Sequence, residues 1–242
     1  MDSEEFRVLV VCTGNINRSA LAAALLRTWA DWYLSPEVAA HVVVTSAGLA
    51  APAGRPMRSR TREIAERLGA DGQSHRAAQI DERALRRADL VLVADVAHRD
   101  GVLAIVPSRL RSTFTIREAG GIAARFGPSR APTSIDELRA RIAAFSRRRE
   151  LGAADDGDIT DPQGRDDEAY RDMAREEVPP LTAIAASLFG MPKAEVDAVL
   201  ETIADPEAFP FEALERSEAP GGSAFRAASS DRRRRWFGRR DT

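Results

Sequence analysis

The chain has 242 residues, of which 35 are basic and 37 acidic, giving a formal net charge of −2. This length suits one domain of ordinary size with a tail, and the balanced charge argues against a dedicated nucleic-acid binder. A single cysteine excludes an internal disulfide, and three widely separated histidines do not form a metal-binding motif. The N-terminus, MDSEEF, is unlike a secretory signal, and no apolar window reaches the ~18 residues of a membrane span. We therefore expect a cytoplasmic protein.

Apolar runs alternate with helical patterns along the first 190 residues. Strands are predicted at residues 7–11, 41–48, 89–94 and 112–116, and helices at 19–34, 58–70, 81–88, 96–106, 117–126 and 168–190. This alternation is typical of a three-layer α/β fold, in which right-handed crossovers place helices on both faces of a parallel sheet. Ligands of such sheets bind at the carboxyl ends of the strands, so the end of the first strand is the place to expect a site.

The first predicted strand leads into the segment VCTGNINRS, residues 11–19. A strand-to-helix turn whose amides point inward binds anions, and the helix that begins near Ser19 adds its positive dipole end. Gly14 and Asn15 suit unusual backbone conformations, and Arg18 can offer two parallel donors to a tetrahedral oxyanion. Among these groups Cys12 should be a thiolate at neutral pH, with the Ser19 hydroxyl donating to its sulfur.

The loop thus combines a nucleophile with a phosphate cradle made by Thr13, Gly14, Asn15, Ile16, Asn17, Arg18 and Ser19. Attack of the Cys12 thiolate on a bound phosphate monoester would give a phosphocysteine intermediate. A buried structural cysteine is the alternative, but the flanking strand and helix favour the catalytic interpretation. The sequence contains neither a Walker loop nor a GxGxxG or HExxH motif, so nucleotide binding through these loops and metal-dependent hydrolysis are not indicated.

Hydrolysis by this route also needs a proton donor for the leaving oxygen. The segment GDITDPQGRDD supplies Asp161, which precedes a rigid proline and lies between the last predicted strand and the last long helix. A second Asp-Pro, at Asp205, is expected to form a structural turn. The other acidic residues around Asp161 are expected to be solvated loop charges: Asp155, Asp156, Asp158, Asp166 and Asp167.

Over residues 6–190 the order and spacing of these motifs resemble the low-molecular-weight protein tyrosine phosphatase family. The family's V-C-x-G-N-x-C-R-S loop corresponds to VCTGNINRS, its S-A-G segment to TSAGLAAPAGRPM, and its late D-P to residues 161–162. The HRA stretch, ADLVLVADVAH and FTIRE are further similarities, and residues 128–152 are extra length. The resemblance implies a four-stranded parallel sheet flanked by helices and a reaction without metal or cofactor.

The resemblance also implies a role for each site residue. Cys12 would be the nucleophile, Arg18 the phosphate clamp, and Asp161 the general acid and then the base. Asn15 would hold the loop shape and Ser19 would assist the thiolate. Ser46, in the S-A-G segment, would belong to the hydrogen-bond network that supports Asn15.

The sequence departs from the family pattern at several positions. Asn17 stands where a second loop cysteine is usual, so a protective disulfide with Cys12 cannot form. Ala20 replaces the usual proline, which is a mild change at a helix start. Gln163 and residues 50–53 stand where the family often has aromatic side chains, which line the crevice for phosphotyrosine. Their absence affects the expected substrate more than the expected chemistry.

The predicted function is a cysteine-dependent phosphatase that acts on protein phosphotyrosine or on a small phosphate ester, with no nucleic acid required. Two alternatives stay open: an arsenate reductase that uses a small-molecule thiol, and an inactive module that binds phosphate or phosphopeptides. Residues 1–190 are predicted to form the phosphatase domain, and 191–208 an extra helix, at 194–204, with a linker. Residues 209–242 are predicted to be a disordered basic tail, whose DRRRRWFGRR segment could touch an anionic surface.

Overall fold

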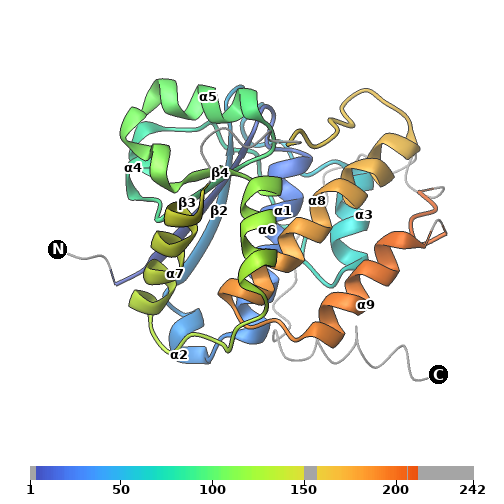
Figure 1. The fold of residues 1–242 in the computed structure, drawn as a ribbon. Coiled ribbons are helices and arrows are strands. Elements are labelled where there is room, and N and C mark those ends of the chain that lie inside the picture. The colour runs from blue at the N-terminus through green and yellow to red at the C-terminus, as the bar shows by residue number, and fades with distance from the viewer. Residues whose placement is uncertain (1–3, 150–156, 206, 212–242) are drawn as a thin grey trace.

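The computed structural model describes residues 4–149, 157–205 and 207–211. Four parallel strands form the centre of the molecule, in the order β2-β1-β3-β4 (Figure 1). They are β1 (Phe6–Cys12), β2 (Val42–Gly48), β3 (Leu90–Val93) and β4 (Thr113–Thr115). The buried apolar run of β1 is typical of an interior strand covered on both faces. The parallel sheet confirms the predicted α/β fold.

Helices cover both faces of this sheet. They are α1 (Arg18–Tyr33), α2 (Pro36–Ala39), α3 (Ser59–Arg67), α4 (Glu82–Arg87), α5 (Val96–Ile105), the 3₁₀ helix η1 (Pro107–Ser112), α6 (Ile116–Phe126), α7 (Ile135–Arg148), α8 (Asp167–Leu188) and α9 (Lys193–Ala204). Alternate residues of β1 point to opposite faces. Phe6, Val8 and Val10 join an apolar cluster with α1, α6, α7 and α8, whereas Leu9 and Val11 join a cluster with α4 and α5.

The predicted strands and helices coincide with the observed ones to within three residues at either end. Three helices, α2, η1 and α7, are not predicted, and α7 occupies much of the extra length between residues 128 and 152. Ser134 caps α7 by accepting a hydrogen bond from the amide of Glu137, and Leu138, Ile142 and Phe145 are buried. Because these apolar residues follow helical spacing, the signal for α7 is present in the sequence.

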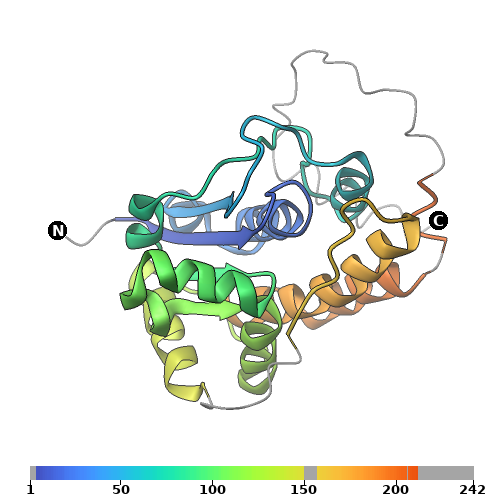
Figure 2. The same cartoon turned by 90° about the horizontal axis from the view of Figure 1, so that it is seen from above.

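The chain after α9 folds back onto α8, and the two helices lie side by side in both views (Figures 1 and 2). Phe209 and Phe211 are buried with ring centroids 6.2 Å apart, and Arg171 of α8 donates to the carbonyl of Phe209. The predicted start of the tail at residue 209 is therefore too early, and the rest of that tail lies outside the described residues. None of the described helices is long and apolar enough to cross a membrane.

Candidate functional site

The loop between β1 and α1 lies at the carboxyl end of the sheet, as the sequence predicts. Asn15 takes the left-handed conformation, with φ of 53°. Gly14 does not, and a Cβ at Gly14 would make only ordinary contact with the Ile16 side chain, at 3.5 Å. The positive φ of this loop is therefore at Asn15, and Asn17 departs from the common regions in another way, with φ of −124° and ψ of −100°.

Asn15 is held by the segment that contains the HRA stretch. Its Oδ1 accepts a hydrogen bond from the amide of Ala78 at 2.9 Å, and its carbonyl lies 2.7 Å from His75 Nε2. Its Nδ2 donates to Ser19 Oγ at 2.9 Å. The described residues show no hydrogen bond between Ser46 and Asn15, so the predicted support from Ser46 is wrong. In the register of β1 and β2, Ser46 pairs with Val10, and two further pairs separate it from the start of the loop.

The glycine of the S-A-G segment has a steric role instead. Gly48 pairs with Cys12 at the end of β2. A Cβ at Gly48 would lie 2.5 Å from the carbonyl oxygen of Thr13 and 3.1 Å from the amide nitrogen of Asn15. Only glycine therefore permits this close approach between β2 and the loop.

Cys12 is buried at the base of the loop, with 2% of its surface exposed. Its Sγ lies 2.9 Å from Ser19 Oγ and accepts from the amide of Asn15 at 3.3 Å. Because Ser19 Oγ already accepts from Asn15, its own hydrogen is free to point at the sulfur. Both donors would stabilise negative charge on Sγ.

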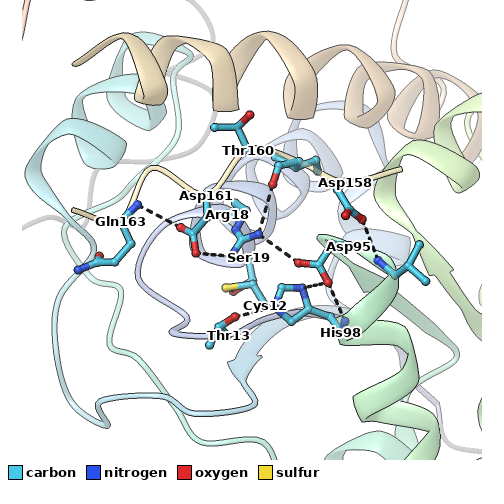
Figure 3. A network of polar contacts seen from close by, with 12 residues as sticks. Cys12, Thr13, Arg18, Ser19, Asp95, His98, Asp158, Thr160, Asp161 and Gln163 are labelled. Carbon is cyan, nitrogen blue, oxygen red and sulfur yellow. Dashed lines mark hydrogen bonds and ion pairs between the residues drawn. The ribbon is translucent and has the colours of Figure 1, made fainter. Parts of the chain in front are cut away.

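Arg18, the first residue of α1, is buried beside the loop and reaches two other segments (Figure 3). Its Nη1 donates to Asp95 Oδ2 at 3.3 Å and to the carbonyl of Ile159 at 3.2 Å, and its Nη2 donates to Asp161 Oδ2 at 2.7 Å. Among the described residues, Nε has no partner. Nε and Nη2 share one edge of the guanidinium, the edge that can offer two parallel donors to an oxyanion.

Asp161 lies on a loop that is fastened at several points. The amide of Ile159 donates to the carbonyl of Ala94, after β3, at 3.1 Å. The amide and hydroxyl of Thr160 donate to the carboxylate of Glu176 in α8, at 2.6 and 3.1 Å. Asp161 Oδ1 accepts from the amide of Gln163 at 3.1 Å, while about half of the side chain, 47%, stays exposed. The loop thus carries Asp161 to Arg18, over 140 residues away in sequence.

Two residues of the site are missed by the sequence reasoning: Asp95 and His98, in the first turn of α5. Asp95 Oδ1 caps the helix by accepting from the amide of His98 at 2.7 Å, and it also lies 2.8 Å from His98 Nδ1. His98 Nε2 lies 2.7 Å from Thr13 Oγ1. Burial alone would raise the pKa of Asp95, but the hydrogen bonds from His98 and the charge of Arg18 outweigh burial and hold it below its usual value. The available signal was an aspartate directly after a buried strand, in VADVAH.

The two departures Asn17 and Gln163 meet across the site. Asn17 Oδ1 accepts from the hydroxyl of Thr61 in α3 at 2.8 Å, and Nδ2 lies 3.5 Å from Gln163 Oε1. Next to it, the carbonyl of Ile16 accepts from the amide of Arg58 at 3.1 Å. Asn17 therefore joins the anion loop, α3 and the loop that carries Asp161.

Three of the acidic residues near Asp161 have structural partners, while Asp158 and Asp166 remain exposed to solvent as expected. Asp158 accepts from the amide of Val96 at 3.1 Å. Asp166 caps α8 by accepting from the amide of Ala169, and Asp167 pairs with Arg60. Asp155 and Asp156 lie outside the described residues. Within the described ranges, no three His, Cys, Asp or Glu side chains are grouped so as to hold a metal ion.

Known proteins of one family resemble this chain. The family model for low molecular weight phosphotyrosine protein phosphatases matches residues 7–118. A probable low molecular weight protein-tyrosine-phosphatase, EpsP of Ralstonia solanacearum, is 38% identical over 111 residues, or 46% of this chain and 70% of that protein. A protein-arginine-phosphatase of Geobacillus stearothermophilus is 27% identical over 176 residues, or 73% of this chain and 90% of that protein.

The fold is shared with solved structures of the same kind. A low molecular weight protein tyrosine phosphatase from T. tengcongensis superimposes with a TM-score of 0.53 and 26% identity, covering 74% of this chain and 97% of that chain. Together with the loop and its flanking strand and helix, these similarities identify the family. The chain belongs to the low molecular weight phosphotyrosine protein phosphatases and is a cysteine-based phosphoric monoester hydrolase.

Proposed function

We propose that this phosphatase hydrolyses phosphotyrosine in proteins through a phosphocysteine intermediate, with Cys12 as nucleophile, Arg18 as phosphate clamp and Asp161 as general acid. One observation carries the proposal. The sulfur of Cys12, the donor edge of Arg18 and the carboxylate of Asp161 come from three separate segments and converge at the carboxyl end of the sheet (Figure 3). A nucleophile, an anion clamp and a proton donor are the parts that this reaction requires.

Phosphate binding would use the loop amides and Arg18 together. Two phosphate oxygens would accept from Nε and Nη2 of Arg18. Among the described residues Nε has no partner, and Nη2 donates to Asp161. Asp161 must release Nη2 for this to happen. Nη1 would stay on Asp95 and on the carbonyl of Ile159, so the guanidinium would keep its place while its ligand changes.

The covalent steps follow from this placement. The Cys12 thiolate attacks phosphorus, the bond to the leaving oxygen breaks, and Asp161 donates its proton to that oxygen. The Asp161 carboxylate then takes a proton from water, which attacks phosphocysteine and releases phosphate. Ser19 Oγ and the amide of Asn15 stabilise the returning thiolate, because both already contact Sγ.

Phosphoarginine is the second candidate substrate, and the Geobacillus relative supports it because it is named a protein-arginine-phosphatase and is covered over 90% of its length. The charge near Tyr170 favours tyrosine. The backbone amide of Arg58 donates to the carbonyl of Ile16, and the charge of the Arg58 side chain opposes the rise in the pKa of Tyr170 that burial causes. A positive side chain near Tyr170 disfavours a cationic guanidinium and tolerates a neutral phenol ring.

The proposal predicts distinct effects of two substitutions. Cys12→Ser should lower kcat on a phosphotyrosine peptide by about 10⁴-fold or more, because the nucleophile is lost. Asp161→Asn should lower it by about 10²–10³-fold, because the leaving phenolate needs a proton. The second loss should shrink on para-nitrophenyl phosphate, whose leaving group is already acidic. The measurement is a pH–rate profile for each variant on both substrates.

The matched control is Asp166→Asn, which removes a nearby negative charge but keeps an N-cap of equal quality. Its kcat should stay within about twofold of the wild type. An Asp161→Asn enzyme that keeps full activity on the phosphotyrosine peptide would contradict the assignment of the acid. Faster turnover of a phosphoarginine peptide would favour the second candidate. Arsenate reduction with a small thiol, or phosphate binding without turnover, would favour the remaining alternatives.

A further inference from the structure

A continuous chain of polar contacts runs from the phosphate clamp to the residue that follows the nucleophile. It passes from Arg18 Nη1 to Asp95, from Asp95 to His98, and from His98 Nε2 to Thr13 Oγ1 (Figure 3). His98 is buried, with 4% of its surface exposed. The mechanism above uses neither the imidazole of His98 nor the hydroxyl of Thr13, so this buried titratable group needs its own explanation.

The contacts fix where the hydrogens of His98 lie. Asp95 Oδ1 can only accept and lies 2.8 Å from Nδ1, so this ion-pair contact favours a hydrogen on Nδ1, although the two atoms do not meet hydrogen-bond geometry. In the neutral ring Nε2 is then bare and accepts the hydroxyl hydrogen of Thr13 across 2.7 Å. In the protonated ring Nε2 donates to Thr13 Oγ1 instead, and the hydroxyl hydrogen becomes free to point elsewhere.

We propose that His98 is a positioning residue for phosphate binding: it holds Asp95 against Arg18 and sets the direction of the Thr13 hydroxyl beside Cys12. This inference rests on the proposed function, because it concerns the same anion site. With the neutral ring, the hydroxyl hydrogen is tied to His98 and Thr13 presents lone pairs to the site. With the protonated ring, the hydroxyl can donate to a phosphate oxygen, so a bound phosphate and a protonated His98 favour one another.

The charges around His98 agree with this coupling. Asp95 is the N-cap residue of α5, the helix that carries His98. Arg18 lies at the start of α1 and Cys12 at the end of β1. Asp158 and Asp161 lie on the loop before α8. Asp95 and Asp158 are each fixed by a backbone amide of α5, so their positions do not depend on a ligand. Asp161 would leave Arg18 when phosphate enters, while His98 would stay in contact with Asp95 and Thr13; His75, the other histidine at this loop, contacts the carbonyl of Asn15 instead.

The test measures binding of inorganic phosphate in a Cys12→Ser background, where no chemistry can occur. His98→Gln and Thr13→Val should each weaken phosphate by about five- to tenfold, as expected for one lost charge-assisted hydrogen bond. The double variant should be no weaker than the worse single variant, because both remove the same contact. Thr13→Ser, which keeps the hydroxyl, should restore most of the affinity lost in Thr13→Val.

A second readout separates positioning from a purely structural role. In the active enzyme, His98→Gln should raise KM for an aryl phosphate by a larger factor than it lowers kcat, because the contact acts on phosphate binding and not on the reacting atoms. His41→Gln, at an exposed histidine before β2, is the control and should leave phosphate affinity unchanged. Additive losses in the double variant, or a lower kcat with an unchanged KM, would overturn the proposal. Because binding is measured without turnover, failure of the proposed function would be seen separately, as absent activity in the wild type.

Discussion

Asn15 serves the anion loop in two ways that substitutions can separate. Its backbone takes the left-handed conformation, with φ of 53°, which costs most L-residues roughly 1–2 kcal/mol. Its side chain joins Ser19 to the amide of Ala78. The backbone conformation shapes the turn. The side chain links Ser19, which contacts the sulfur of Cys12, to the distant segment at Ala78.

At this residue we predict that Asn15→Ala is less stable than Asn15→Gly by about 1 kcal/mol, because glycine accepts the positive φ and alanine does not. Both should lower kcat/KM on an aryl phosphate, since both release Ser19 and Ala78. Urea unfolding and steady-state kinetics measure the two effects. Equal stability of the two variants would mean that the backbone at residue 15 relaxes at no cost.

At the scale of elements, α6 and α8 touch at adjacent glycines that have opposite surroundings. A Cβ at Gly120 would lie 2.3 Å from Cβ and 2.6 Å from Cα of Pro180. A Cβ at Gly121 would have nothing within 4 Å. Pro179 and Pro180 lie inside α8 and lack backbone donors, so the fit of α6 against this turn matters for the helix pair.

These neighbours give a matched pair of variants. Gly120→Ala should lower the free energy of unfolding by about 1–3 kcal/mol, because the contact is with backbone and cannot give way easily. Gly121→Ala should raise it by about 0.5–1 kcal/mol, because alanine loses less entropy in a helix. Chemical denaturation of both variants tests this. A harmless Gly120→Ala would show that α8 can move away from α6 freely.

At the scale of the whole molecule, Glu177 of α8 makes the free energy of unfolding depend on pH. It is fully buried, and among the described residues neither carboxyl oxygen has a hydrogen-bond partner. Burial raises the pKa of Glu177 well above its usual value, and the charge of Arg18 opposes this only in part. The native state therefore holds a proton that the unfolded chain releases above about pH 4.5.

The sign of the effect follows from this difference. Above the pKa that Glu177 has in the unfolded chain, the unfolded state binds fewer protons than the native state. The Glu177 contribution therefore lowers the free energy of unfolding as pH rises, by at most about 1.4 kcal/mol per pH unit. Glu177→Gln should remove this slope: the variant should gain stability over the wild type toward neutral pH, and the gain should fade near pH 4. Glu82→Gln, at an exposed residue of α4, is the control. Parallel curves of stability against pH for wild type and Glu177→Gln would contradict the prediction.

The parts that sequence predicts well are those that depend on neighbouring residues. The apolar run before Cys12, the helix after Arg18 and the Asp-Pro at Asp161 are all local patterns, and the structure has them at those places. Asp95 and His98 were missed because their importance lies in contacts with Arg18 and Thr13, which are 77 and 85 residues away.

The wrong expectations have the same cause. The S-A-G segment was correctly placed next to the loop, but strand register puts Gly48 rather than Ser46 beside it. The support for Asn15 comes from Ala78 and His75, and no local pattern reveals this pairing. Phe211 likewise looks like part of a polar tail until its packing against Tyr170 is known.

The ion pair between Asp161 and Arg18 means that the protein carries its own tethered competitor for the anion site. A carboxylate fixed 2.7 Å from Nη2 acts at a local concentration that no free carboxylate in solution can match. The apparent affinity for any anion is the intrinsic affinity multiplied by the fraction of time that Asp161 is displaced. A phosphate monoester dianion, with more charge and more acceptor oxygens, displaces this competitor better than a singly charged anion does. In the proposed function, Asp161 would therefore select ligands by charge before it donates a proton.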